Sequence, residues 1–247
     1  MNLDRIIAVR NNKTVYRDGN KCLKVFNSDY SKANVLNEAL NQARIELTGL
    51  NIPKVLEVTV IDGKWTIVSE FIKGKSLQQL INDDRENADK YLEIFVNTQV
   101  KMNSVTCSDL NSQSEKMEKS ILLTDLNATQ RYNLYLKLKN MPESNNICHG
   151  DYNPTNIIIT DDGIPFIIDW SHVTRGDCCA DAAWTYLLFL FNNDTDMANK
   201  YLTLFCKKSK NNTACVKNWV STVAASRLIR CNEAQRNFLY GYVNDEL

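Results

Sequence analysis

The stretch ICHGDYNPTNIIITDDGIPFIIDW constrains the fold of this chain more than any other part of the sequence. Two short apolar runs, near 157–160 and 164–168, flank an Asp-Asp-Gly turn, and this pattern predicts a β-hairpin. Three polar residues stand at its rims: Asp151, Asn156 and Asp169. Each of them alone would fit a turn or a cap, but all three at these spacings favour a site for a metal and for proton transfer.

Pairing of the two runs would bring Asn156 and Asp169 side by side at the open end of the hairpin. Their side-chain oxygens are the type of ligand that Mg²⁺ prefers in proteins. Asp151 lies on the preceding loop and would face the space in front of the metal. This layout suits phosphoryl transfer, in which Asp151 meets the acceptor hydroxyl while the metal at the hairpin holds the γ-phosphate.

A cation for the phosphates is expected from the strand KCLKVF, which contains Lys24. Alternation along a strand places Cys22 and Lys24 on the same face, where the small Cys22 leaves room for a flat purine. Glu38, in the helical segment that follows, is the best-placed carboxylate to orient Lys24. Glu46 lies two turns later on the same segment and remains an alternative partner.

The first seventy residues have a β-rich pattern. Strand-like runs at 14–16 and 22–26 enclose an Arg-Asp-Gly-Asn turn, and runs at 55–61 and 65–71 enclose an Asp-Gly turn. Between these two hairpins, the apolar residues of 35–47 repeat at helical spacing. The expected order is therefore strand, strand, helix, strand, strand.

Beyond Gly74 the pattern is helical apart from the central hairpin. Ser-Leu-Gln-Gln at 76–79 has the form of a capping box that opens a helix. Polar linkers separate the helical segments before the hairpin, near 82–89, 106–114 and 124–128. After the hairpin we expect helices at roughly 179–192, 195–208, 214–230 and 232–243. The sequence thus predicts an α+β, two-lobed fold, with a small β-rich N-terminal lobe (1–72) and a larger, mostly helical C-terminal lobe (73–247) that carries the hairpin.

Composition excludes several classes of protein. The formal net charge is zero, so no overall field favours nucleic acid or an anionic membrane as a partner. No window approaches eighteen uninterrupted apolar residues, and the N-terminal stretch lacks the apolar run of a signal peptide. The eight cysteines include no CxxC pair, and neither histidine lies at zinc-ligand spacing from one of them. These features are typical of a reduced, cytoplasmic protein.

The run HGDYNPTN followed by IIDW resembles the HGDxxxxN and IDW motifs of the aminoglycoside phosphotransferase and choline kinase family. That family has a protein-kinase-like fold. The resemblance extends to LKVF at 23–26, which looks like the lysine strand, and to SEFIKG at 69–74, which is similar to the hinge between the lobes. It covers most of the chain and implies an ATP- and Mg²⁺-dependent enzyme that phosphorylates a hydroxyl group of a small molecule.

The resemblance also implies roles for individual residues. Asp151 corresponds to the catalytic base, and Asn156 and Asp169 correspond to the magnesium ligands. Lys24 would contact the α- and β-phosphates of the nucleotide. The residues whose backbone would hydrogen-bond adenine form the hinge: Glu70, Phe71 and Ile72.

The first turn, Arg-Asn-Asn-Lys-Thr at 10–14, departs from the family because it lacks the glycines that let a backbone close over phosphates. Asparagine tolerates positive φ, so Asn11 and Asn12 are expected to serve in their place. The departure leaves GTP open as an alternative to ATP. It also leaves open a nucleotide-binding pseudokinase or regulatory module. A kinase that acts on a protein partner is a further alternative, although HGD replaces HRD and Asp-Trp replaces DFG.

The acceptor is constrained only by charge. The segment after Trp170 contains slightly more basic than acidic residues. This balance weakly disfavours a polycationic aminoglycoside and permits a neutral or anionic hydroxylated metabolite. The expected partner is therefore a small hydroxylated substrate, and the sequence leaves the oligomeric state open.

Overall fold

The computed structural model describes residue 3 and residues 5–244, so the outermost ends of the two expected lobes, 1–72 and 73–247, fall outside the described residues. The chain forms two compact units. The first consists of Met1–Arg85 and Pro154–His172, and the second of Glu86–Asn153 and Val173–Leu247. The lobe boundary expected at residue 72 stays a prediction.

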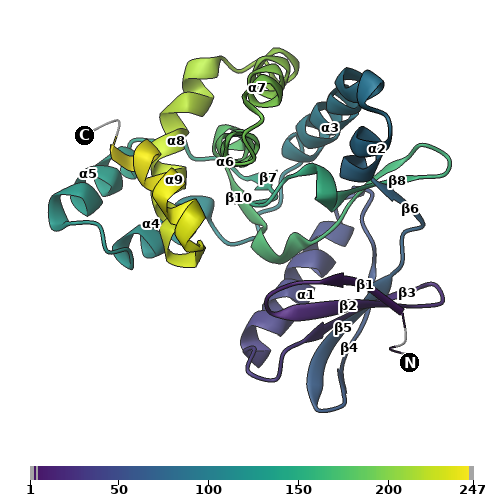
Figure 1. The fold of residues 1–247 in the computed structure, drawn as a ribbon. Helices are drawn as coiled ribbons and strands as arrows, with labels where there is room; N and C mark the ends of the chain where they lie inside the picture. Colours follow the sequence, from purple (N-terminus) through teal and green to yellow (C-terminus); the bar gives the residue numbers. More distant parts are fainter. Residues whose placement is uncertain (1–2, 4, 245–247) are drawn as a thin grey trace. The chain divides into compact units, whose positions relative to one another are not determined.

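An antiparallel sheet dominates the first unit (Figure 1), and within the described residues it has five strands in the order β1-β2-β3-β5-β4. The strands are β1 (Arg5–Val9), β2 (Lys13–Asp18), β3 (Lys21–Phe26), β4 (Val55–Ile61) and β5 (Lys64–Glu70). Both hairpins expected from the sequence are present, because β2 pairs with β3 and β4 pairs with β5. The strand β1, by contrast, was not expected.

Alternation along β3 separates its side chains between the two faces of the sheet. Leu23 and Val25 are buried with Val68 on one face. Phe26 is buried on the other face, where it packs with residues of the helix α1 (Lys32–Glu46). Lys24 shares the face of Phe26 because the side-chain period of a strand is two residues. The predicted orientation of the lysine is therefore confirmed.

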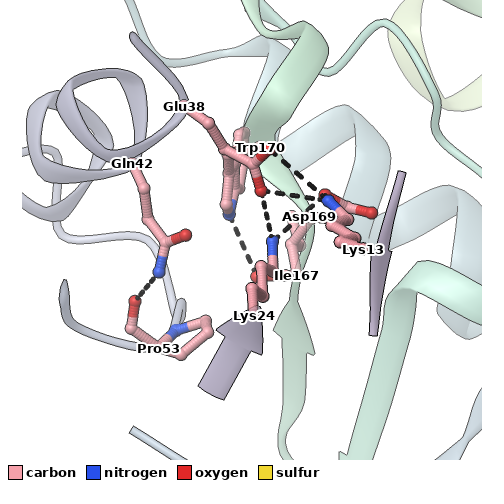
Figure 2. Close-up of polar contacts among 8 residues, drawn as sticks. All are labelled: Lys13, Lys24, Glu38, Gln42, Pro53, Ile167, Asp169 and Trp170. Atoms are coloured by element: carbon pink, nitrogen blue, oxygen red, sulfur yellow. Dashed lines mark hydrogen bonds and ion pairs between the residues drawn. The ribbon is translucent and has the colours of Figure 1, made fainter. Parts of the chain in front are cut away.

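The helix α1 is fixed to the chain that leads into β4 by two side chains. Gln42 donates a hydrogen bond from Nε2 to the carbonyl of Pro53 at 2.6 Å (Figure 2), and Glu46 accepts one from the amide of Val55 at 2.7 Å. These contacts determine which residues of α1 face the sheet. The Glu46 carboxylate therefore binds the backbone of Val55 and not Lys24.

The central hairpin is also part of the first unit. The strands β8 (Ile157–Thr160) and β9 (Pro165–Ile167) pair with each other as predicted, and β6 (Gly74–Ser76) adds a third strand on β8. The helix α2 (Leu77–Asp83) begins at Ser76 with the expected capping box. Trp170 is fully buried just after β9, and its indole N–H donates to the carbonyl of Ile167 at 3.1 Å (Figure 2).

The second unit is mostly helical, which confirms the α+β class. The helix α6 (Cys178–Phe191) packs against both α7 (Thr195–Ser209) and α8 (Thr213–Arg227), and α3 (Ala88–Asn103) packs against α7 (Figure 1). The other helices are α4 (Gln113–Leu122), α5 (Ala128–Lys139) and α9 (Glu233–Asn244). A two-stranded ladder joins β7 (Asn146–Cys148) to β10 (Thr174–Gly176). These helices lie close to the residue ranges expected from the sequence.

Two further observations bear on the sequence-based expectations. Among the described residues, no helix has both the length and the apolar character needed to cross a membrane. All eight cysteines belong to the described residues and are free thiols. The cytoplasmic location stays a prediction.

Candidate active site

Lys24 lies between two carboxylates in the first unit (Figure 2). Its Nζ atom is 2.7 Å from Oε1 of Glu38 and 3.1 Å from Oδ1 of Asp169. Glu38 is therefore the partner of Lys24, and the alternative of Glu46 is wrong because that carboxylate binds the amide of Val55. The contact joins β3, α1 and the residue that follows the β8–β9 hairpin.

The two carboxylates stabilise the charge of Lys24. Burial acts to lower the pKa of Lys24, but the adjacent carboxylates of Asp169 and Glu38 outweigh it and hold this pKa above its ordinary value. Burial likewise acts to raise the pKa of Asp169, and the two neighbouring lysines reverse the shift and hold that pKa below its ordinary value. Both groups are therefore charged at neutral pH.

A second lysine, Lys13, enters the same cluster and was not among the residues expected from the sequence. Its Nζ atom lies 3.1 Å from Oε1 of Glu38 and 3.1 Å from Oδ1 of Asp169 (Figure 2). Lys13 is the first residue of β2 and directly follows the turn that lacks glycines. The cluster thus contains two ammonium groups and two carboxylates.

The hairpin brings Asn156 and Asp169 to its open end, as the predicted pairing required. The amide of Ile168 donates to the carbonyl of Asn156 at 2.9 Å, which extends the ladder of β8 and β9 by one bond. Asp169 has a φ of 64°, a left-handed conformation that is uncommon for residues other than glycine. Such a conformation directs the chain sharply after the hairpin and is often found at functional sites.

The side chains at this end of the hairpin suit a hard divalent cation. Asn156 offers an amide oxygen and Asp169 a carboxylate, and Mg²⁺ prefers such oxygen donors. Asn156 is only 7% exposed, which is unusual for an asparagine. Both residues line the same cavity, so the chemistry of the donor set fits magnesium.

That cavity has a volume of about 420 Å³, and all the residues that line it belong to the first unit. Its charged wall includes Lys13, Lys24 and Asp169, and Cys22 lies beside Lys24 as the strand pattern predicted. Of the other predicted nucleotide-side residues, Glu70, Phe71, Ile72 and Asn156 also line it, whereas Glu38 does not and lies behind Lys24 as its partner. A cavity of this size and mixed polarity is typical of a site for a small ligand.

The hinge residues have fixed positions at the edge of the cavity. The amide of Glu70 donates to the carbonyl of Lys54, and the amide of Phe71 donates to the carbonyl of Asn20, both at 2.9 Å. The guanidinium of Arg17 lies 4.1 Å from the centre of the Phe71 ring. The Phe71 amide is therefore engaged within the protein.

The turn before Lys13 does not behave as expected. Neither Asn11 nor Asn12 has a positive φ, so the prediction that they replace the missing glycines is wrong. Instead, Asn27 holds the turn: its backbone amide donates to the carbonyl of Asn12 at 2.9 Å, and its side-chain amide donates to the carbonyl of Asn11 at 3.1 Å. The backbone conformation that the missing glycines would provide is therefore absent at Asn11 and Asn12.

Asp151 belongs to the second unit, within the segment 149–153 that we call the Asp151 loop. Gly150 has a φ of 76°, which explains why glycine precedes the aspartate. Asp181 on α6 accepts hydrogen bonds from the amides of Gly150 at 2.8 Å and His149 at 3.2 Å. His149 in turn accepts, at Nδ1, a bond of 3.2 Å from the amide of Asp151 and so helps to shape the loop.

The residue after Asp151 anchors the Asp151 loop in the core of the second unit. Tyr152 is fully buried, and its hydroxyl donates to the carbonyl of Phe95 at 2.8 Å. The hydroxyl of Thr185 donates to the carbonyl of Tyr152, also at 2.8 Å. The loop therefore has fixed contacts on α3 and α6.

One basic residue, Arg227, contacts the Asp151 loop. Arg227 donates from Nη2 to the carbonyl of Gly150 at 2.6 Å, and its guanidinium lies 4.4 Å from the centre of the Trp184 ring. Burial lowers the pKa of Arg227, while the nearby carboxylate of Asp151 acts in the opposite direction. Burial, together with repulsion from Arg227 and Arg230, lowers the pKa of Lys116 to about 7. Arg227 thus joins the loop backbone to the carboxylates of Asp151 and Asp181, with which its charge interacts.

A sheet whose lysine pairs with a glutamate on the following helix, together with a hairpin that ends in an amide and a carboxylate, defines a protein-kinase-like fold. The sequence pattern of the phosphotransferase enzyme family matches residues 5–217. The chain belongs to that family. None of the curated proteins compared with the chain matches it by sequence.

Solved structures of aminoglycoside phosphotransferases share the fold. The enzyme APH(4)-Ia is 15% identical with a TM-score of 0.71, and the match covers 97% of this chain and 91% of the other. The enzyme APH(3'')-Id from Streptomyces rimosus is 14% identical with a TM-score of 0.62, over 89% and 91% of the two chains. The ternary complex of APH(2'')-IIa with streptomycin and ATP is 12% identical with a TM-score of 0.61, over 97% and 90%. At these identities the likeness concerns the fold.

Proposed function

We propose that this phosphotransferase moves the γ-phosphoryl group of ATP to a hydroxyl group of a small molecule. The proposal is carried by the contact of Glu38 with Lys24 and by the position of Lys24 and Asp169 at the wall of the cavity. A buried lysine held by two carboxylates is a pre-organised cation for nucleotide phosphates. Similar chains are known in complexes with ADP and hygromycin B and with ATP and streptomycin, which supports ATP as the donor.

Each nucleotide-side residue has a role in this proposal. Lys24 contacts the phosphates and Glu38 fixes its orientation. Asn156 and Asp169 would hold magnesium, which, when bound, offsets charge on the phosphate oxygens. Because the Phe71 amide is engaged with Asn20, we assign the hinge contact with adenine to the backbone of Ile72. GTP remains an alternative donor.

Asp151 is the proposed base of the reaction. The contacts of Asp181 with the Asp151 loop support this role, because they fix the backbone on the N-terminal side of the aspartate. A base that is already positioned needs no reorganisation when the acceptor hydroxyl arrives. The charge of the Asp151 carboxylate interacts with the buried guanidinium of Arg227.

The cationic surroundings of Asp151 indicate the class of acceptor. Arg227 contacts the Asp151 loop and interacts with Arg230, and these two guanidinium groups disfavour a polycation, whereas a hydroxyl compound that is neutral or carries a carboxylate or phosphate fits them. We therefore infer that the acceptor is a neutral or anionic small molecule rather than an aminoglycoside. This inference agrees with the slightly basic composition after Trp170.

The first experiment is phosphate transfer from radiolabelled ATP with magnesium over a panel of acceptors. The panel contains aminoglycosides, choline, sugars, nucleosides, and sugars that carry a carboxylate or phosphate. We expect turnover on a neutral or anionic member and a loss of about 10²- to 10⁴-fold in Asp151→Asn. The matched control is Asp161→Asn, because Asp161 is an exposed residue of the hairpin turn.

The outcomes separate the alternatives. Turnover on an aminoglycoside alone would contradict the inferred acceptor class but keep the phosphotransferase. Firm ATP binding in calorimetry with no transfer to any acceptor would favour the nucleotide-binding pseudokinase. Label on the protein itself would favour a kinase with a protein partner. Absence of both ATP and GTP binding would contradict the proposed function.

A further inference from the structure

We propose that Lys13 is a second phosphate-binding cation of the nucleotide site, which acts beside Lys24 where a glycine-rich turn would otherwise hold the phosphates. The proposal rests on the proposed function, because it assumes that a nucleotide occupies the cavity of the first unit. Lys13 would then be a nucleotide-binding residue that lies outside the sequence motifs described above.

The position of Lys13 supports this role. The residue begins β2 and pairs with Phe26 on β3, and its Nζ atom lies 5.6 Å from the centre of the Phe26 ring. The side chain is 7% exposed, which is rare for a lysine. Even so, Lys13 lines the cavity together with Lys24 and Asp169. A buried lysine at the wall of a ligand cavity is placed to meet a ligand.

The ion pairs of Lys13 duplicate those of Lys24. Lys24 already contacts both Glu38 and Asp169, so each carboxylate has a cationic partner without Lys13. Removing another ammonium from water is costly unless its charge is used. Both lysines also converge on the same atom, Oδ1 of Asp169, at 3.1 Å. The two ammonium groups and the two carboxylates of the cluster balance in charge, and Lys13 shares both of its carboxylate partners with Lys24.

The ammonium of Lys13 has the capacity to bind a further oxygen. An ammonium group has three N–H donors, and Lys13 directs them to Oε1 of Glu38 at 3.1 Å, Oε2 of Glu38 at 3.4 Å and Oδ1 of Asp169 at 3.1 Å. The long bond to Oε2 is the one that a phosphate oxygen would replace. A triphosphate brings several anionic oxygens into the same cavity. Charge-assisted hydrogen bonds to such oxygens are stronger than those between neutral groups.

The turn before Lys13 shows why a side chain would take over this task. The turn contains no glycine, and Asn27 binds the carbonyls of Asn11 and Asn12. A glycine-rich turn binds phosphate through backbone N–H groups that converge on it. With this backbone held by Asn27, we assign the compensating positive charge to the next residue, Lys13.

The test compares nucleotides that differ in their phosphates. Calorimetry measures the Kd of ATP and of adenosine for the full-length protein and for Lys13→Met, Lys13→Gln and Lys13→Arg. We expect Lys13→Met and Lys13→Gln to raise the Kd of ATP by roughly 10- to 100-fold and to leave the Kd of adenosine nearly unchanged. Lys13→Arg should retain most of the ATP affinity. The control is Lys21→Met, because Lys21 is an exposed lysine on β3.

The results that overturn the proposal are distinct. If the affinities for ATP and adenosine fall to the same extent, Lys13 is a structural residue. The same holds if the ATP affinity stays unchanged and only the melting temperature falls. Lys13→Gln retains a hydrogen-bonding side chain and serves the same comparison if Lys13→Met does not fold. Failure of the wild-type protein to bind any nucleotide would instead refute the proposed function itself.

Discussion

The Nζ atom of Lys24 and the Oδ1 atom of Asp169 lie 3.1 Å apart, although the residues are separated by 145 positions in the sequence. The contact joins the third strand of the sheet to the end of the β8–β9 hairpin within one compact unit. Because the chain leaves this unit at residue 85 and returns at 154, the site forms only when both segments have folded. Its stability and its affinity for nucleotide are therefore linked.

Removal of the charge of Glu38 should affect both stability and nucleotide binding. Glu38→Gln leaves Lys13 and Lys24 with Asp169 as their remaining carboxylate partner in the cluster. We expect the free energy of unfolding to fall by about 3 kcal/mol, since breaking a buried ion pair leaves charge uncompensated. The ATP affinity should fall as well. Urea unfolding and calorimetry measure the two effects.

The matched control for Glu38 is Glu46→Gln on the same helix. Glu46 binds the backbone amide of Val55 and does not contact the lysines, so its substitution should lower stability alone. Equal losses of ATP affinity in both variants would contradict the assignment of Glu38 as the orienting carboxylate.

Asp181 should control the position of the Asp151 loop. Asp181→Asn replaces one acceptor oxygen by an N–H₂ group that faces a backbone amide of Gly150 or His149. We expect a loss of about 2 kcal/mol in stability and a lower kcat with little change in the KM for ATP. Steady-state kinetics and thermal unfolding check this. The control is Asp196→Asn at an exposed site on α7, which should change neither kcat nor the stability. An unchanged kcat in Asp181→Asn would show that the Asp151 loop keeps its position without the Asp181 carboxylate.

Lys116 should make stability depend on pH above neutrality. Its pKa is about 7 in the folded protein and 10.5 as its ordinary value, so the unfolded chain binds more protons between these limits. The free energy of unfolding therefore rises as the pH increases from about 7 toward 10.5. Urea unfolding at several pH values should show a shallower rise in Lys116→Met. The control is Lys119→Met, at an exposed position on α4, which should show the same dependence of the free energy of unfolding on pH as the wild type. Equal slopes in the wild type and both variants would contradict the lowered pKa of Lys116.

Gly74 should tolerate no side chain. A Cβ atom at this position would lie 2.2 Å from the carbonyl oxygen of Ile159, on the neighbouring strand β8. We expect Gly74→Ala to destabilise the protein by about 2 kcal/mol because the backbone must shift. Gly241→Ala, in the helix α9 with open space around it, should instead stabilise by up to about 1 kcal/mol. Melting temperatures of the two variants test the contrast.

Local patterns explain what the sequence predicted well. The capping box at Ser76 depends on residues within one turn of a helix, and the β8–β9 pairing depends on a turn between two adjacent runs. The pair of Lys24 and Glu38 was also predictable, because strand and helix follow each other directly. The choice between Glu38 and Glu46 needed the structure, since it depends on how α1 is attached to the chain near Pro53 and Val55.

Long-range contacts explain what the sequence did not show. Lys13 follows an Arg-Asn-Asn turn and has the pattern of a solvated lysine, and its burial comes from packing with residues far along the chain. The strands β7 and β10 have three residues each, which is too short for a periodic signal, and the residues that pair are far apart in the sequence, as with Cys148 and Thr174. The strand β1 is short and its side chains are mostly exposed, so it lacks alternation as well.

The anchoring of the Asp151 loop has a consequence for the evolution of acceptor preference. The anchors are interior contacts: Tyr152 with Phe95 and Thr185, and Asp181 with the loop backbone. Mutations on the exposed faces of the surrounding helices leave these contacts intact. Substitutions on these faces can therefore change which acceptor the protein binds without moving the proposed base. Acceptor specificity can then evolve while the residues that transfer the phosphate stay in position.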